Sequence, residues 1–303
     1  MAGRCERLRL CAVTHGFTVI FLCTLVVCSA EGVVEGFEGG AAVLPCTVSI
    51  QGNLRWSALN QPILIRTGGQ VLIEQNTQWK DVISLVGSSN NLSISKISRQ
   101  RDDGKNFTCS DAQGTGQQAT TVRVLVRISG VGIEQASEGQ VTLTEGTPKT
   151  LTCTVTGNPN PNPFYSWMVD DGGVTGQGSS YSLTADRSMR SVRCTATNKY
   201  SDGSVLSTKE ATATLNALYL DTPSATTPVN VTEDETAILV CSAQGNPQST
   251  FAWKMSKSAE VKRTSAVYRI ENVQRSASGE YTCNVTNSVG SGQTTVQLVV
   301  QCE

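Results

Sequence analysis

The spacing of cysteines and aromatic residues is the strongest constraint on how this chain can fold. Near the C-terminal end, Cys241 and Cys283 lie 42 positions apart. Trp253 follows the first cysteine by twelve positions, and Tyr281 precedes the second by two. No single residue in this set is specific, but the spacing favours one compact unit closed by a buried disulfide.

The same order of cysteine, tryptophan and cysteine occurs twice more upstream. The two further sets are Cys46, Trp56 and Cys109, and Cys153, Trp167 and Cys194. In the last two units the tripeptide Gly-Asn-Pro follows the first cysteine at the same offset, at 157–159 and 245–247. This internal repeat of about ninety residues predicts three units of one kind.

Paired cysteines at this distance, with a tryptophan and a tyrosine so placed, are typical of the immunoglobulin-type β-sandwich. We therefore predict an all-β fold, with three tandem immunoglobulin-like β-sandwich domains after a signal peptide. The predicted domains are 31–128 (V/I-type), 129–217 (C2/I-type) and 218–303 (I/C2-type). The predicted disulfides are Cys46–Cys109, Cys153–Cys194 and Cys241–Cys283. Cys302 is left unpaired within the chain; it either bridges two copies or belongs to a truncated further domain, and we favour the second.

Residues 1–30 have the pattern of a secretory signal. Arg4, Arg7 and Arg9 precede an apolar run at 17–28, and small residues precede Glu31. The run is about twelve residues long, whereas a membrane-spanning helix needs about twenty. Because no later span or lipid-anchor signal is visible, we expect a protein that is secreted, or a truncated ectodomain on the extracellular face of the plasma membrane.

Loss of the signal leaves 21 Lys and Arg against 24 Asp and Glu, and it removes His15, the one histidine. Catalysis or zinc binding through histidine is therefore excluded for the mature chain. The slightly acidic balance argues against nucleic acid as a partner. We predict no enzyme activity, no catalytic residue, no cofactor and no metal site.

Four sequons are the clearest signal for a chemical modification. Asn-x-Ser/Thr triplets without proline begin at Asn91, Asn106, Asn230 and Asn284. In a chain that carries a secretory signal, they predict N-linked glycans on the surface.

The first domain departs from the simplest sandwich pattern. The 62 residues between its cysteines leave room for an extra ribbon, which we place at 62–66 with Gly68 and Gly69 as its turn. Phe107 occupies the position of the tyrosine but has no hydroxyl, so the usual corner hydrogen bond should be missing. Gly104 lies one residue earlier than usual, which leaves the local turn undefined. In the middle domain Val192 takes the tyrosine position.

Strand alternation in the first domain defines a candidate binding face. If Trp56, Phe107 and Val124 point into the core, their strand neighbours point outward. The predicted partner-binding residues are Arg55, Ser57, Ile63, Ile65, Ser110, Arg123 and Leu125. A small apolar patch with a polar rim suits a protein interface. The alternative, ordinary exposed apolar surface, stays open.

The whole mature chain resembles the ectodomain of an immunoglobulin-superfamily surface protein. Within the first domain, the segments GGAAVLPC, GNLRW, WKDVISLVG and NLSIS resemble the N-terminal domain of the nephrin and kin-of-irregular-chiasm adhesion receptors. The resemblance implies recognition of a homophilic or heterophilic protein partner, without catalysis. A secreted immune-type receptor or decoy is the second hypothesis, and a structural extracellular-matrix component is the third.

Overall fold

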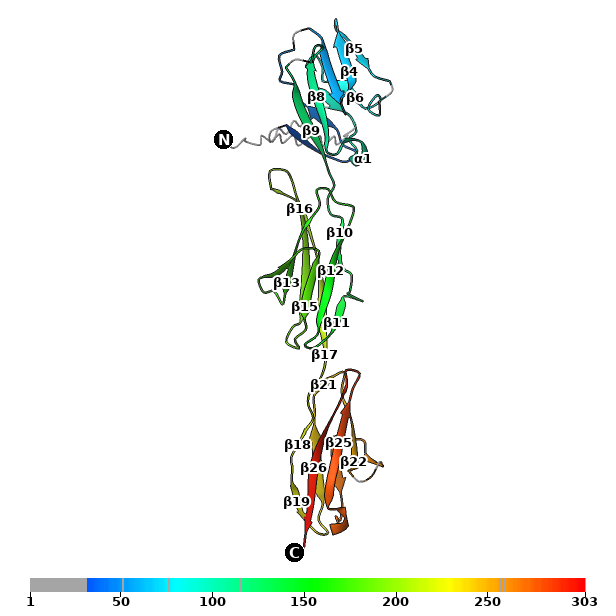
Figure 1. The fold of residues 1–303 in the computed structure, drawn as a ribbon, viewed down its shortest axis with the longest axis vertical. Coiled ribbons are helices and arrows are strands. Elements are labelled where there is room, and N and C mark those ends of the chain that lie inside the picture. The colour runs from blue at the N-terminus through cyan, green and yellow to red at the C-terminus, as the bar shows by residue number, and fades with distance from the viewer. Residues whose placement is uncertain are drawn as a thin grey trace, which may run out of the picture. The chain divides into compact units, whose positions relative to one another are not determined.

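The computed structural model describes residues 32–50, 52–75, 77–114, 116–256, 258 and 260–302. The predicted signal peptide lies outside these residues. Nearly all of the regular secondary structure in the described chain is β-strand, and apart from the short strand β21 each of the three pairs of sheets is built from consecutive strands (Figure 1). No helix among these residues is long and apolar enough to cross a membrane.

The first pair of sheets forms a sandwich with an unusually wide front sheet. Its strand order is β1-β9-β8-β3-β4-β5, and the back sheet has the order β2-β7-β6. The elements are β1 (Val33–Phe37), β2 (Ala42–Leu44), β3 (Leu54–Ala58), β4 (Gln61–Thr67), β5 (Gln70–Ile73), β6 (Ile83–Leu85), β7 (Leu92–Ile94), α1 (Arg99–Asp102), β8 (Lys105–Asp111) and β9 (Gln118–Leu125). The extra ribbon predicted at 62–66 is therefore two strands, β4 and β5, joined where Gly68 and Gly69 both have positive φ.

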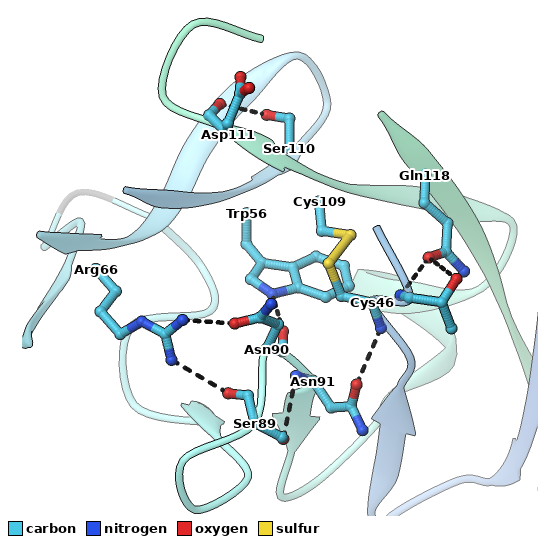
Figure 2. Close-up of a disulfide and its surroundings, with 11 residues drawn as sticks. Cys46, Trp56, Arg66, Ser89, Asn90, Asn91, Cys109, Ser110, Asp111 and Gln118 are labelled. Carbon is cyan, nitrogen blue, oxygen red and sulfur yellow. Dashed lines mark hydrogen bonds between the residues drawn. A yellow bond between two sulfur atoms is a disulfide. The ribbon is translucent and has the colours of Figure 1, made fainter. Parts of the chain in front are cut away.

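The core of the first sandwich follows the alternation of its strands. In β3, Leu54, Trp56 and Ala58 are buried while the residues between them are partly exposed. Trp56 packs beside the disulfide Cys46–Cys109 and donates its indole N–H to the carbonyl of Asn90 at 2.9 Å (Figure 2). Burial of each large apolar side chain in this core contributes about 1.5–3 kcal/mol.

A buried carboxylate, that of Asp102, joins the segments near Phe107, where the tyrosine hydroxyl is missing. Trp79 packs edge-on against Phe107, with 5.6 Å between ring centroids, and its Nε1 donates to Asp102 Oδ1 at 2.8 Å. Asp102 is the last residue of the short helix α1. Ser98 caps the N-terminus of this helix, because its side chain accepts a hydrogen bond from the N–H of Arg101. The local turn is thus a single helical turn, and Gly104 follows it with a φ of +70°.

The second pair of sheets has the orders β10-β12-β15 and β11-β17-β16-β13-β14. Its strands are β10 (Gly130–Ile133), β11 (Gln140–Thr144), β12 (Pro148–Thr156), β13 (Phe164–Val169), β14 (Val174–Gln177), β15 (Ser180–Thr184), β16 (Ser191–Lys199) and β17 (Val205–Leu220). Trp167 is fully buried and stacks on Tyr181 at 5.7 Å between ring centroids. Cys153 and Cys194 form the disulfide of this sandwich, and Val192 is buried two residues before it.

The third pair has the orders β18-β20-β24 and β19-β26-β25-β22-β23. Its elements are β18 (Ser224–Ala225), β19 (Val229–Thr232), β20 (Ala237–Ser242), β22 (Thr250–Met255), β23 (Val261–Arg263), β24 (Val267–Ile270), the 3-10 turn η1 (Arg275–Ala277), β25 (Gly279–Thr286) and β26 (Ser291–Gln301). The short strand β21 (Gly245–Asn246) follows β20 in the chain but pairs with β17 of the second pair. Cys241 and Cys283 are bonded beside Trp253 in its core. The hydroxyl of Tyr281 donates to the carbonyl of Ala277 at 2.9 Å, as a tyrosine corner requires.

One asparagine ties the end of the first sandwich to the loops of the second. The side-chain amide of Asn198 donates to the carbonyl of Val126 at 2.9 Å and to that of Pro161 at 3.3 Å. The backbone of Val126 also pairs with Asn160 as an isolated bridge. These bonds hold the segment that follows β9 against residues 160–161 and 198.

The same device recurs one repeat later. The amide of Asn287 donates to the carbonyl of Tyr219 at 2.8 Å and to that of Pro247 at 2.9 Å. Tyr219 pairs with Asn246 across strands β17 and β21. The repeated Gly-Asn-Pro tripeptides therefore begin loops that bond back to the preceding strand.

The predicted domain boundaries stay predictions. Backbone proximity groups the chain into two compact units, one holding residues up to 132, 154–165 and 195–210, the other 133–153, 166–194 and 211–303. The first unit contains the first pair of sheets, and the second contains the third pair.

Candidate partner-binding face

The outward face of the front sheet in the first sandwich carries most of the predicted binding residues. Trp56 and Cys109 face each other across β3 and β8, and both are buried. Arg55 and Ser57, on either side of Trp56, are partly exposed. Strand β4 continues this face, because Arg55 is opposite Ile65, which is also partly exposed.

Ile63 does not reach this face. The pairing of β3 with β4 shifts between Trp56 and Ser57, so that Trp56 is opposite Leu64 and Ser57 is opposite Pro62. Ile63 is the extra residue of this irregularity, and both Ile63 and Leu64 are fully buried. The expectation that Ile63 is an exposed contact residue is therefore wrong, and Ile65 is the outward member of the apolar run.

Leu125 is also buried, with 1% of its surface exposed. It does not belong to the core cluster of the first sandwich. Asn160 bonds to the residues on either side of Leu125. Its side-chain amide donates to the carbonyl of Val124, and its backbone oxygen accepts from the N–H of Val126 at 2.8 Å. The end of β9 is thus covered, which removes Leu125 from the accessible face.

The other two predicted residues, Ser110 and Arg123, differ in solvent exposure. Ser110 is 5% exposed and donates its hydroxyl to the carbonyl of Asp111 at 2.9 Å. Arg123 is accessible, and its guanidinium lies 3.5 Å from the buried carboxylate of Glu35. Of the seven predicted residues, the structure leaves Arg55, Ser57, Ile65 and Arg123 accessible.

Leu72 is an exposed apolar residue that the sequence reasoning did not select. It lies on edge strand β5 directly opposite Ile65 and is 62% exposed. Two adjacent apolar side chains at a sheet edge form a small patch of the kind found at the centre of interfaces. The Gly68–Gly69 turn was the available signal, since a hairpin at that point sets Leu72 against Ile65.

A shallow hollow of about 590 Å³ lies beside this patch. The lining residues come from β3, β8, β9 and the turns that join them: Arg55, Ser57, Leu59, Asn60, Gly104, Lys105, Asn106, Thr108, Ser110, Gly114, Gln117 and Ala119. Most of these side chains are polar, and none is acidic. The face therefore combines an apolar edge with a hydrogen-bonding centre.

The four sequon asparagines are all accessible to a glycan. Asn106 and Asn230 are exposed, and Asn91 and Asn284 are partly exposed. Asn91 accepts a hydrogen bond from the N–H of Cys46 through Oδ1 at 3.0 Å, which leaves the amide nitrogen as the attachment point (Figure 2). Because Asn106 lines the hollow, a glycan there would stand at the edge of the candidate face.

Cys302 follows the last strand, β26. It is exposed and forms no disulfide with any residue that the structure describes. Whether it pairs with a second copy or with a further domain stays open, as the sequence left it.

Comparison with known proteins agrees with this architecture. A family model described as an immunoglobulin domain matches residues 222–287. Hemicentin-2 of Mus musculus is 27% identical over 221 residues, which is 66% of this chain and 4% of that protein. The basement membrane-specific heparan sulfate proteoglycan core protein of Mus musculus is 24% identical over 293 residues, 89% of this chain and 7% of that protein. Neuronal cell adhesion molecule of Rattus norvegicus is 26% identical over 66% of this chain and 17% of its own length.

Solved structures with the same fold include a titin fragment and a chain from a complex of two proteins. The I67–I69 fragment of titin has a TM-score of 0.53 at 16% identity and covers 89% of this chain and 96% of that one. The complex of Dpr2 Ig1–Ig2 with DIP-Theta Ig1–Ig3 also gives 0.53 at 16% identity, covering 89% of this chain and 97% of that one.

Residues 222–287 match the immunoglobulin-domain family, and the chain as a whole has the fold of tandem immunoglobulin-like sandwiches. More particularly, it is similar in sequence to these three relatives over 66–89% of its own length, but it spans only 4–17% of theirs. No catalytic family appears in these comparisons. The narrower resemblance to the nephrin group stays a prediction.

Proposed function

We propose that this protein is an extracellular recognition or adhesion molecule that binds another protein through the first sandwich and has no catalytic role. The observation that carries the proposal is the outward face of the front sheet. There the apolar pair Ile65 and Leu72 lies beside a polar hollow. An apolar centre with hydrogen-bonding neighbours is the usual composition of a specific interface.

The position of Ile65 and Leu72 at the sheet edge supports a role in binding a partner rather than in stabilising the fold. Leu72 is 62% exposed, so it contributes little to the core of its own sandwich. A leucine that becomes buried against a partner gains about 25 cal/mol for each Å² of apolar surface removed from water. The relatives include a protein named as a neuronal cell adhesion molecule, and one structural neighbour is a complex between immunoglobulin domains.

The test is binding of the secreted, glycosylated chain to itself and to an array of cell-displayed extracellular domains. Ile65→Asp and Leu72→Asp should each reduce binding at least about tenfold, because a charge is placed in an apolar contact. Val240→Asp is the matched control, since Val240 is an exposed apolar residue, 47% accessible, on the third sandwich. Undiminished binding by both face variants, with unchanged melting temperatures, would place the contact elsewhere.

A structural role in extracellular matrix is the second candidate. It is favoured by the match to a basement membrane proteoglycan over 89% of this chain and by the repeated asparagine contacts at 198 and 287. Under this hypothesis the secreted protein should stay in the insoluble matrix fraction of expressing cells. Full recovery in the medium without detergent or chaotrope would count against it.

A further inference from the structure

We propose that the hollow on the first sandwich receives an acidic side chain of the protein partner, with Arg55 as the residue that binds its carboxylate. The inference rests on the function proposed above and specifies the chemistry of the partner. Three observations support the inference: the positive charge of the residues that line the hollow, the terminal nitrogens of Arg55 that remain available, and the hydrogen-bond donors around Arg55.

The lining of the hollow is positively charged without compensation. Arg55 and Lys105 contribute two cations, and the lining contains no aspartate or glutamate. The side chain of Lys105 has no hydrogen bond or ion pair with any described residue. An uncompensated pair of cations in a concave surface attracts an anion more strongly than the same charges on a flat surface.

Arg55 differs from the other arginines of its sandwich. Its one side-chain bond runs from Nε to the hydroxyl of Ser57 at 3.2 Å, which leaves both terminal nitrogens available. The other five arginines in 32–128 have a carbonyl, carboxylate or ring partner: Arg66 with Ser89, Arg99 with Asn158, Arg101 with Asp102, Arg123 with Glu35 and Arg127 over Phe37. A guanidinium with an open edge is suited to bind a carboxylate through two parallel hydrogen bonds.

Neighbouring side chains add uncharged donors. The hydroxyls of Ser57 and Thr108 lie opposite each other on β3 and β8, and the amides of Asn60 and Gln117 line the rim. A volume of about 590 Å³ is larger than one carboxylate needs, so the tip of a partner loop fits better than a free ion. The apolar pair Ile65 and Leu72 then meets the residues that flank the acidic side chain.

The charge of the whole chain points in the same direction. Residues 31–128 contain 9 Lys and Arg against 8 Asp and Glu, whereas residues 129–303 contain 12 against 16. The first domain is therefore the positive part of an acidic chain. Such an asymmetry speeds the approach of an acidic partner, and salt should weaken it because the screening length is about 8 Å at physiological ionic strength.

The direct test uses nuclear magnetic resonance of the full secreted chain. The probe is the peptide acetyl-Gly-Glu-Gly-amide, and the same peptide with glutamine is its control. We expect the glutamate peptide to shift the Arg55 Nε–Hε signal and the amide of Thr108, with millimolar affinity. Arg55→Gln should weaken the response at least about tenfold, while Arg269→Gln, an exposed arginine of the third sandwich, should leave it unchanged.

Three results would overturn the inference. They are equal shifts with both peptides, shifts confined to residues outside the hollow, and a response to methyl α-sialoside but not to the glutamate peptide, which would assign the site to a glycan carboxylate. With a protein partner recovered by the binding array, Arg55→Gln should reduce affinity about 10- to 100-fold, partly through a slower association rate. If Arg55→Gln binds that partner normally while Leu72→Asp does not, the inference about the hollow fails and the proposed function stands.

Discussion

Replacement of the buried Asp102 by alanine should destabilise the first sandwich more than the loss of any charge on its surface. Asp102 is fully buried, and its carboxylate accepts four hydrogen bonds. They come from Trp79 Nε1 at 2.8 Å, from the N–H of Ser98 at 2.8 Å and from two nitrogens of Arg101 at 2.9 and 2.7 Å. The alanine variant leaves all of these donors without the carboxylate.

The magnitude follows from the burial of these groups. Removal of one partner from a buried ion pair costs about 3–5 kcal/mol, and the unsatisfied indole and backbone N–H groups overlap with that cost rather than add fully to it. Since a domain of this size is stable by about 5–15 kcal/mol, the loss is a large fraction of the total. A loss of 3 kcal/mol or more lowers the melting temperature of a 100-residue domain by at least about 12 °C.

The measurement is differential scanning calorimetry of the full secreted chain. The melting temperature of the first sandwich should fall, and those of the other sandwiches should not change. Asp102→Asn keeps one oxygen acceptor and should lie between wild type and alanine. Glu260→Ala is the control, because Glu260 pairs with Lys262 at the exposed surface, where water screens the interaction and the pair adds little to stability. If the free energy of unfolding of Asp102→Ala lies within 1 kcal/mol of the wild-type value, the buried carboxylate does not stabilise this region.

Four further predictions concern the third sandwich and the chain as a whole. Tyr281→Phe removes the bond to Ala277 and should cost about 1 kcal/mol in denaturant unfolding. Burial, and then the nearby tyrosine at 268, raises the pKa of Tyr281 above its ordinary 10.0, so its contribution is complete below pH 10 and is lost as the pH rises further, a loss that Tyr281→Phe should not show. Asn287→Ala removes the side-chain donor to two carbonyls and should cost about 1–3 kcal/mol. Joint replacement of Cys241 and Cys283 by alanine should cost roughly 4 kcal/mol and lower the last melting transition. Treatment with an N-glycosidase should reduce the mass of the secreted chain, and an unchanged mass would contradict use of the sequons.

The sandwich core was predictable because the two patterns that indicate it are local in the sequence. They are the spacing of each tryptophan from its cysteine and the alternation of side chains along a strand. Trp56, Trp167 and Trp253 are all fully buried, as their spacing from the cysteines indicated. Alternation in β3 placed Arg55 and Ser57 outward. In a strand the side-chain period of two is a property of the backbone, so it can be read before any partner strand is known.

The candidate face was only partly predictable because its residues depend on pairing between strands. The register shift between β3 and β4 beside Trp56 turns Ile63 inward, and no residue type in that segment predicts the shift. The same pairing placed Leu72 beside Ile65. Leu125 lies in a strand whose alternation the sequence indicates, yet its exposure depends on what covers the end of β9.

The sequence by itself determined the disulfide spacing, the three-fold repeat and the inward positions of the tryptophans. Tertiary structure alone decided that Asp102 is buried against Trp79, that Arg55 keeps open donors above an acid-free hollow, and that Asn198 and Asn287 bond to the strand before them. The physical reason is that spacing and alternation are local and periodic. Hydrogen-bond partners and burial are instead set by residues tens of positions away, which meet only when strand register and loop closure are fixed.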